Sequence, residues 1–245
     1  MALPKVSTAT YTLKIPSSGK EVTYRPFLVK EEKQLLMAME SNDTKVMAKA
    51  MSNIVSACTE EEIDMDDLAP FDLEYFFLNL RAKSIGDVIK LQMRRPDNIN
   101  CCEASNEEDF CEIEIPVENI NVDTSKMVDP NLKITKDIGV KLKYPRFDQV
   151  QGMATDANEL KAEDIFKMII NCIDHISQGD EIYKAKDHTK KELNDFIESL
   201  NSEQFLGIRN FFEGMPRLRH DISWECPNCK KNEKITLEGL ESFFG

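Results

Sequence analysis

The sequence is poor in the residues and motifs on which cofactor enzymes depend. It has nine glycines in 245 residues, which leaves few residues for a glycine-rich phosphate-binding loop. It contains no Gly-x-x-x-x-Gly-Lys phosphate loop, no Gly-x-Gly-x-x-Gly after a strand and no Gly-x-Ser-x-Gly elbow. The three histidines, His175, His188 and His220, are scattered and form no His-Glu-x-x-His zinc motif. We therefore expect no catalytic residues and no enzymatic activity.

Basic charge and long apolar runs are also scarce. There are 31 Lys and Arg against 44 Asp and Glu, which gives a net charge of −13. A surface of this sign repels phosphate backbones, so nucleic-acid binding is not expected. The most apolar windows, such as IFKMIINCI at 165–173, are too short to cross a bilayer, and no basic segment precedes an apolar run at the N-terminus. We expect a cytosolic protein without membrane contact.

The cysteines are odd in number and come without a secretory signal. Such a set favours reduced thiols or metal ligands over a disulfide framework. Two of them, Cys58 and Cys172, fall on apolar faces of expected helices and are interpreted as core residues. All seven are Cys58, Cys101, Cys102, Cys111, Cys172, Cys226 and Cys229.

The motif Cys226-Pro-Asn-Cys229 has three interpretations. A Cys-x-x-Cys turn can present two thiolates to a tetrahedral zinc, and Cys111 with Cys102 or Cys101 would complete the ligand set. A redox pair would need a helix N-terminus, but an expected strand follows the motif, so this is the weakest interpretation. An ordinary hairpin turn is favoured, and a structural zinc remains as the alternative. No other cofactor is expected.

The hydrophobic periodicity predicts an α+β fold over residues 1–245, as a single unit that is either compact or bilobed. An N-terminal β-hairpin, a β-rich middle and a C-terminal strand pair are expected to share sheet structure, with helices packed from two segments. The β-rich ranges are 1–29, 87–145 and 217–239, and the helical ranges are 30–84 and 147–214.

Local spacing makes these expectations more specific. In the first helical range, Leu35, Leu36 and Met39 are predicted to share one face. A helix is expected to run without a break over 162–176. Several residues are expected to cap helices: Asp72 after Pro70, Thr189 with Glu192 in a capping box, and Ser202.

Five segments, in order and covering nearly the whole chain, carry a family resemblance: VTYRPFLVKEEKQLLMAMES, FDLEYFFLNLRAKSIGDVIKL, GVKLKYPRFDQV, FFEGMPRLRHDISWECPNC and TLEGLESFFG. The chain resembles the baseplate hub and hub assembly proteins of T-even-type contractile-tailed bacteriophages. The resemblance implies a non-enzymatic structural or assembly protein, made late in infection, whose partners are other hub and tail proteins. It further implies that the protein assembles in the host cytoplasm and can belong to the virion tail. The alternative function is a zinc-ribbon-like adaptor held by Cys102, Cys111, Cys226 and Cys229.

An assembly protein needs surface patches that become buried only in the complex. One candidate is the C-terminal stripe, which either packs on its own core or inserts into a neighbour; it consists of Leu237, Leu240, Phe243 and Phe244, close to one helical face. The other candidate is the strand exit RPFLVKEE at 25–32, with Arg25 and Phe27 as contact residues.

Overall fold

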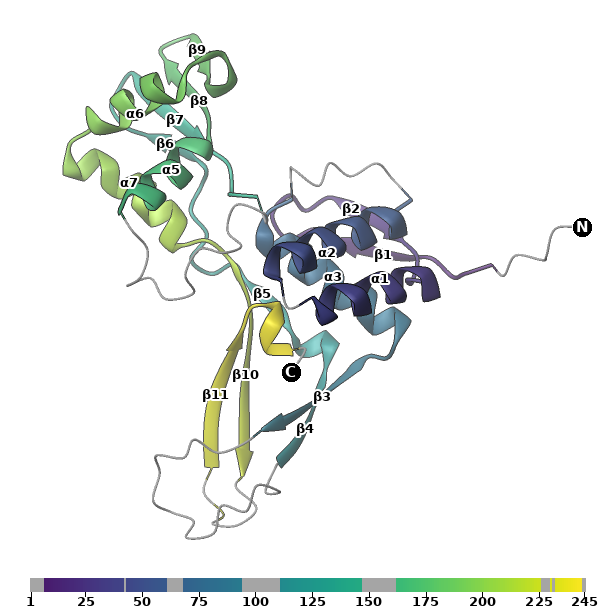
Figure 1. The fold of residues 1–245 in the computed structure, drawn as a ribbon. Helices are drawn as coiled ribbons and strands as arrows, with labels where there is room; N and C mark the ends of the chain where they lie inside the picture. The colour runs from purple at the N-terminus through teal and green to yellow at the C-terminus, as the bar shows by residue number, and fades with distance from the viewer. Residues whose placement is uncertain are drawn as a thin grey trace, which may run out of the picture.

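Helices alternate with small antiparallel sheets along the chain, which confirms the α+β class (Figure 1). The computed structural model describes residues 7–41, 43–60, 68–93, 111–146, 162–225, 230 and 232–243. The elements are β1 (Tyr11–Lys14), β2 (Glu21–Tyr24), α1 (Val29–Glu40), α2 (Thr44–Cys58), α3 (Pro70–Ser84), β3 (Val88–Met93), β4 (Cys111–Pro116), η2 (Val117–Asn119), β5 (Asn121–Asp123), β6 (Asn131–Lys133), β7 (Ile138–Leu142), α5 (Ala162–Asn171), β8 (Ile173–Gln178), β9 (Glu181–Lys184), η3 (Ala185–Asp187), α6 (Lys190–Glu198), α7 (Ser202–Glu213), β10 (Arg217–Glu225), β11 (Asn232–Glu238) and η4 (Leu240–Phe243).

The N-terminal hairpin forms a sheet of its own. β1 and β2 pair antiparallel with Leu13 opposite Val22, and both side chains are buried because alternate residues of a strand face the same side. Among the named strands of the described residues, β1 and β2 pair only with each other. The expectation that this hairpin shares a sheet with the later strands is therefore wrong. Its outer edge meets only a single bridge, from Tyr24 to Thr59 at the end of α2.

The middle of the chain and its C-terminal part do share a sheet, in the order β11-β10-β5. Leu218 of β10 lies opposite Val122 of β5, while the longer part of β10 pairs with β11. β3 and β4 form a separate hairpin. In Figure 1 this hairpin and β10–β11 both extend away from the helices toward the lower end of the molecule.

The remaining strands form a sheet in the order β6-β7-β8-β9. The predicted helix over 162–176 is correct only as far as Asn171. The amide of Cys172 bonds to the carbonyls of both Met168 and Ile169, which closes the last helical turn, and Ile173 begins β8. Strand β8 then turns through Gly179, whose φ of 58° is easily reached only by glycine.

At two helices the observed N-cap residue differs from the predicted one. α3 begins at Pro70, so Asp72 is its third residue; the Asp72 carboxylate accepts the Ala69 amide at 3.3 Å. Asn201 rather than Ser202 caps α7, because the Asn201 side chain accepts the Gln204 amide at 2.9 Å. The predicted capping box of Thr189 and Glu192 is confirmed.

Buried side chains form two separate clusters. The first joins the N-terminal hairpin, α1 to α3, β3, β4 and the β5–β10–β11 sheet. The second lies between the four-stranded sheet and α5, α6 and α7, and we call this part of the molecule the distal lobe (Figure 1). No helix in the described part of the chain is long and apolar enough to cross a membrane.

Candidate protein contact surface

Helix α1 presents large apolar side chains to solvent. Val29 is 79% exposed, Met37 61% and Leu36 54%. Val29 and Leu36 are two helical turns apart and so lie on the same side of the helix. We define the α1 apolar face as Leu28, Val29, Leu36, Met37 and Met39, all of which are exposed.

The opposite side of α1 packs on the core. Its buried residues are Glu31, Leu35 and Ala38, which follow one another at spacings of four and three. The prediction that Leu35, Leu36 and Met39 share one face is wrong, because only Leu35 is buried. The outward side of the helix therefore carries large exposed apolar residues interspersed with the charged residues Glu32, Lys33 and Glu40.

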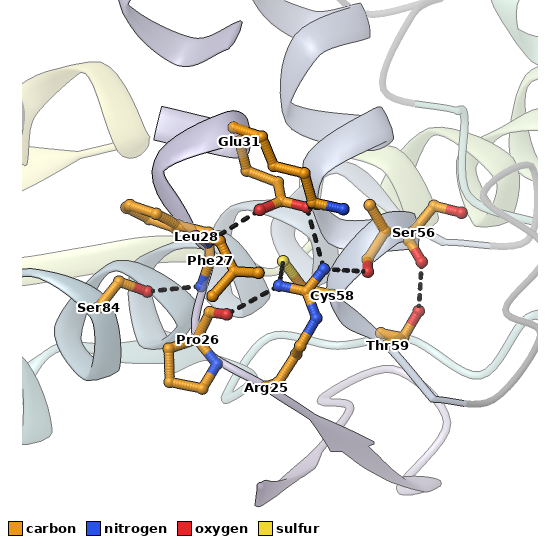
Figure 2. Close-up of polar contacts among 11 residues, drawn as sticks. Arg25, Pro26, Phe27, Leu28, Glu31, Ser56, Cys58, Thr59 and Ser84 are labelled. Atoms are coloured by element: carbon orange, nitrogen blue, oxygen red, sulfur yellow. Dashed lines mark hydrogen bonds and ion pairs between the residues drawn. The ribbon is translucent and has the colours of Figure 1, made fainter. Parts of the chain in front are cut away.

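Arg25 fixes the position from which α1 starts (Figure 2). Its Nη2 donates to the Ala57 carbonyl at 2.9 Å and lies 2.9 Å from Glu31 Oε1. Its Nη1 donates to the Pro26 carbonyl at 3.0 Å and approaches Cys58 Sγ at 3.6 Å. The guanidinium thus joins the end of β2, the first turn of α1 and the end of α2.

Glu31 caps the N-terminus of α1 from the side that faces the core. Its side chain is 2% exposed, and Oε2 accepts the Leu28 amide at 2.8 Å. Burial alone would raise the pKa of Glu31, but the hydrogen bonds from Arg25, Leu28 and Lys30 outweigh it, and the pKa lies below its usual value. The same bond to Glu31 raises the pKa of Arg25. Because every group of this cluster is engaged with a protein partner, it is suited to holding α1 in place rather than to acid–base chemistry.

Phe27, predicted as a contact residue, is buried in the core. Its amide donates to Ser84 Oγ at 3.0 Å, and Ser84 Oγ donates to the Leu80 carbonyl at 2.6 Å. The structure therefore buries Phe27, leaves Arg25 half-buried, and exposes their neighbours Leu28 and Val29. The sequence feature that could have identified Leu28 and Val29 is the apolar run that continues from the end of the strand into the helix.

A match to a known protein family covers nearly the whole chain. Residues 8–245 match the family described as T4 bacteriophage base plate protein. The chain belongs to this family. No curated protein and no solved structure matched this baseplate protein.

In the baseplate protein, the predicted C-terminal stripe does not lie on one helical face. Leu237 belongs to β11, and the chain leaves that strand at Gly239, whose φ is 71°. Leu237 and Leu240 are both buried in the first core cluster. Of the two arrangements considered for the stripe, these two residues therefore adopt packing on the protein's own core. The side chain of Phe243 and all of Phe244 lie outside what the structure describes.

The predicted zinc ligands of the baseplate protein fall mostly outside the described residues. These are Cys102, Cys226 and Cys229; Cys111 begins β4, but its side chain is not described. Within the described ranges, no group of three or more His, Cys, Asp or Glu side chains could hold a metal ion. The buried Cys58 and Cys172 lie in the interior, as predicted; desolvation raises the pKa of Cys58 to about 11 and that of Cys172 to about 12. Both thiols are therefore poor nucleophiles.

Proposed function

We propose that this protein acts in assembly of the baseplate hub, without catalysis, through contacts between its α1 apolar face and another hub or tail protein. It would do so in the host cytoplasm and remain in the tail baseplate. No nucleic acid or membrane takes part in this function.

The exposure of the α1 apolar face supports the proposal most directly. Neighbouring apolar side chains exposed on a monomer are typical of surfaces that a partner covers. Two of the five are methionines, whose flexible side chains adapt to a partner's shape. The ion pair between half-buried Arg25 and buried Glu31 holds the helix so that this face is presented without rearrangement.

Site-specific photocrosslinking during infection tests the proposal. A photoreactive amino acid at Leu36 should crosslink to another tail protein of the same phage, identified by mass spectrometry. The same amino acid at Ile235 of β11, which is 42% exposed and lies outside both proposed contacts, serves as the matched control. Crosslinks to tail proteins from Ile235 and none from Leu36 would place the contact elsewhere.

A zinc-stapled adaptor is the second candidate function. The described ladders of β3–β4 and β10–β11 end at the pairs Met93–Cys111 and Glu225–Asn232, and both hairpins extend toward the same end of the molecule (Figure 1). Residue 226 therefore follows directly from the end of one ladder, and Cys111 stands at the end of the other. Elemental mass spectrometry of the untagged protein decides between the candidates: one zinc per chain, lost in Cys226→Ser, supports the adaptor, and absence of zinc removes it.

A further inference from the structure

The distal lobe contains a basic pocket in a protein that is acidic overall. The pocket has a volume of about 540 Å³ and lies where β8, β9, η3 and the first turn of α6 meet. Its charged and titratable lining consists of Lys143, Lys184, Lys186, Lys190, His175, His188 and Asp174. We call this the basic pocket.

The lysines reach the basic pocket from different elements. Lys143 directly follows β7, Lys184 ends β9, Lys186 lies in η3 and Lys190 is the first residue of α6. The sheet and these short connections therefore gather positive charges that are up to 47 positions apart in the sequence. His175 and His188 are 13 positions apart in the sequence and form no motif, yet both line this one pocket.

No carboxylate among the described residues forms an ion pair with these four lysines. Some lysines elsewhere are paired: Lys90 contacts Glu112 and Glu114, and Lys167 contacts Glu163 and Asp164. The acidic residue in the pocket wall, Asp174, is engaged by its neighbour, with 2.8 Å between Asp174 Oδ2 and His175 Nδ1. The lining therefore holds four lysines and one carboxylate, and this excess of positive charge attracts anions.

The lining also indicates which kind of anion fits. Lys ammonium groups are compact point charges that attract carboxylates and phosphates alike, so the rest of the lining and the overall charge select the ligand. Ile170, Ile173 and Leu193, which belong to the core of the distal lobe, form the apolar base of the same pocket. The net charge of −13 repels a long polyphosphate chain. A short acidic segment lies within the local positive field of the four lysines, where repulsion from the rest of the surface is screened by salt.

We infer that the basic pocket binds an acidic peptide segment of a partner protein, with carboxylates placed among Lys143, Lys184, Lys186 and Lys190. This inference deepens the proposed assembly function and rests on it, because it gives the chemistry of a second contact. The pocket and the α1 apolar face belong to different lobes, so one partner or two can be engaged at once.

Fluorescence anisotropy with the full chain tests the inference. The probe is a labelled peptide of six aspartates, compared with the same peptide in which asparagine replaces aspartate. The aspartate peptide should bind at low salt and lose affinity as salt rises. The triple variant Lys184→Gln, Lys186→Gln, Lys190→Gln should weaken binding by at least about tenfold, since three charge pairs are lost.

A matched variant, Lys126→Gln, Lys133→Gln, Lys136→Gln, makes the same change in net charge at exposed positions outside the pocket lining and should bind like the wild type. Equal loss in both variants would show that net charge alone attracts the peptide and would overturn the inference. Tighter binding of a single-stranded DNA oligonucleotide of equal charge would also overturn it.

The assay separates this inference from the proposed function. Peptide binding by the isolated chain does not require assembly, and substitutions on the α1 apolar face should leave it unchanged. If those substitutions stop assembly while no aspartate peptide binds, only the inference about the basic pocket fails. If the peptide binds in the pocket while the α1 substitutions have no effect on assembly, the proposed role of α1 fails and the pocket stands.

Discussion

The Tyr144 ring lies against Phe71 of α3 on one side and Phe211 of α7 on the other. The centroid of Tyr144 is 5.1 Å from that of Phe71, edge to face, and 4.9 Å from that of Phe211, stacked. Phe211 belongs to the core of the distal lobe, and α3 supplies much of the first core. Tyr144 therefore connects the lobe that carries the basic pocket with the helices that carry the α1 apolar face.

Tyr144→Ala should lower the free energy of unfolding by about 3 kcal/mol, because a large aromatic contact is lost. Tyr144→Phe should cost little or be slightly stabilising, since the buried hydroxyl has no hydrogen-bond partner among the described residues. Chemical denaturation of the two variants beside the wild type measures both effects. A Phe variant as unstable as the Ala variant would mean that the hydroxyl, and not the ring, makes the contact that matters.

The partly buried ion pair of Arg25 and Glu31 gives a second prediction. Arg25→Ala and Glu31→Ala should each destabilise the protein by about 2–3 kcal/mol, because each leaves its partner without its main counter-charge. The double variant should be less unstable than the sum of the single effects, so a double-mutant cycle should give a coupling energy of at least about 1 kcal/mol. Strict additivity would contradict the pairing.

Glu31 also predicts a pH dependence. Its folded pKa lies below the ordinary value of 4.5, so the unfolded chain binds more protons as the solution becomes acidic. The stabilisation is complete above pH 4.5 and is lost as the pH falls through the folded pKa. Urea titrations at several pH values should therefore show that the wild type exceeds Glu31→Gln in stability by a constant amount near neutral pH, and by less below pH 4.5. A difference that is independent of pH would show that Glu31 does not titrate as described.

The C-terminal hairpin allows a prediction with an internal control. Leu240→Ala should cost about 3 kcal/mol in the free energy of unfolding, because Leu240 is 6% exposed and its removal leaves a cavity. Ile235→Ala on β11, the strand that precedes η4, should change stability by less than about 0.5 kcal/mol, since Ile235 is 42% exposed. Thermal or urea unfolding distinguishes the two. Equal effects would show that the tail after Gly239 is not packed as the structure has it.

Local sequence signals predicted much of the fold. Alternation of apolar residues identified the N-terminal hairpin and the C-terminal strand pair, and the spacing of Thr189 and Glu192 identified the start of α6. The error at 173–176 arose because the apolar run of α5 continues directly into β8, where helical and strand patterns look alike. The turn at Gly179 was the signal that would have separated them.

The candidate sites were less predictable because they depend on contacts between distant segments. Which side of α1 faces the core is decided by the hydrogen bonds that Arg25 donates to Glu31 of α1 and to the Ala57 carbonyl of α2, not by α1 alone. The basic pocket depends on how β9 and η3 fold back on β8, which brings Lys143 and Lys186 to one cavity. Apolar spacing within one helix carries no information of this kind.

Assembly of tails with an altered α1 apolar face tests the central claim most directly. The double variant Leu36→Asp, Met37→Asp should unfold within about 1 kcal/mol of the wild type, since both residues are exposed, and should fail to support assembly of complete baseplates when it replaces the wild type in the phage. The control Leu206→Asp, Ile235→Asp places the same charges on exposed residues outside both proposed contacts and should assemble normally. Baseplates counted by electron microscopy give the result: their loss with the α1 variant alone supports the account, and normal baseplates with a folded α1 variant would contradict it.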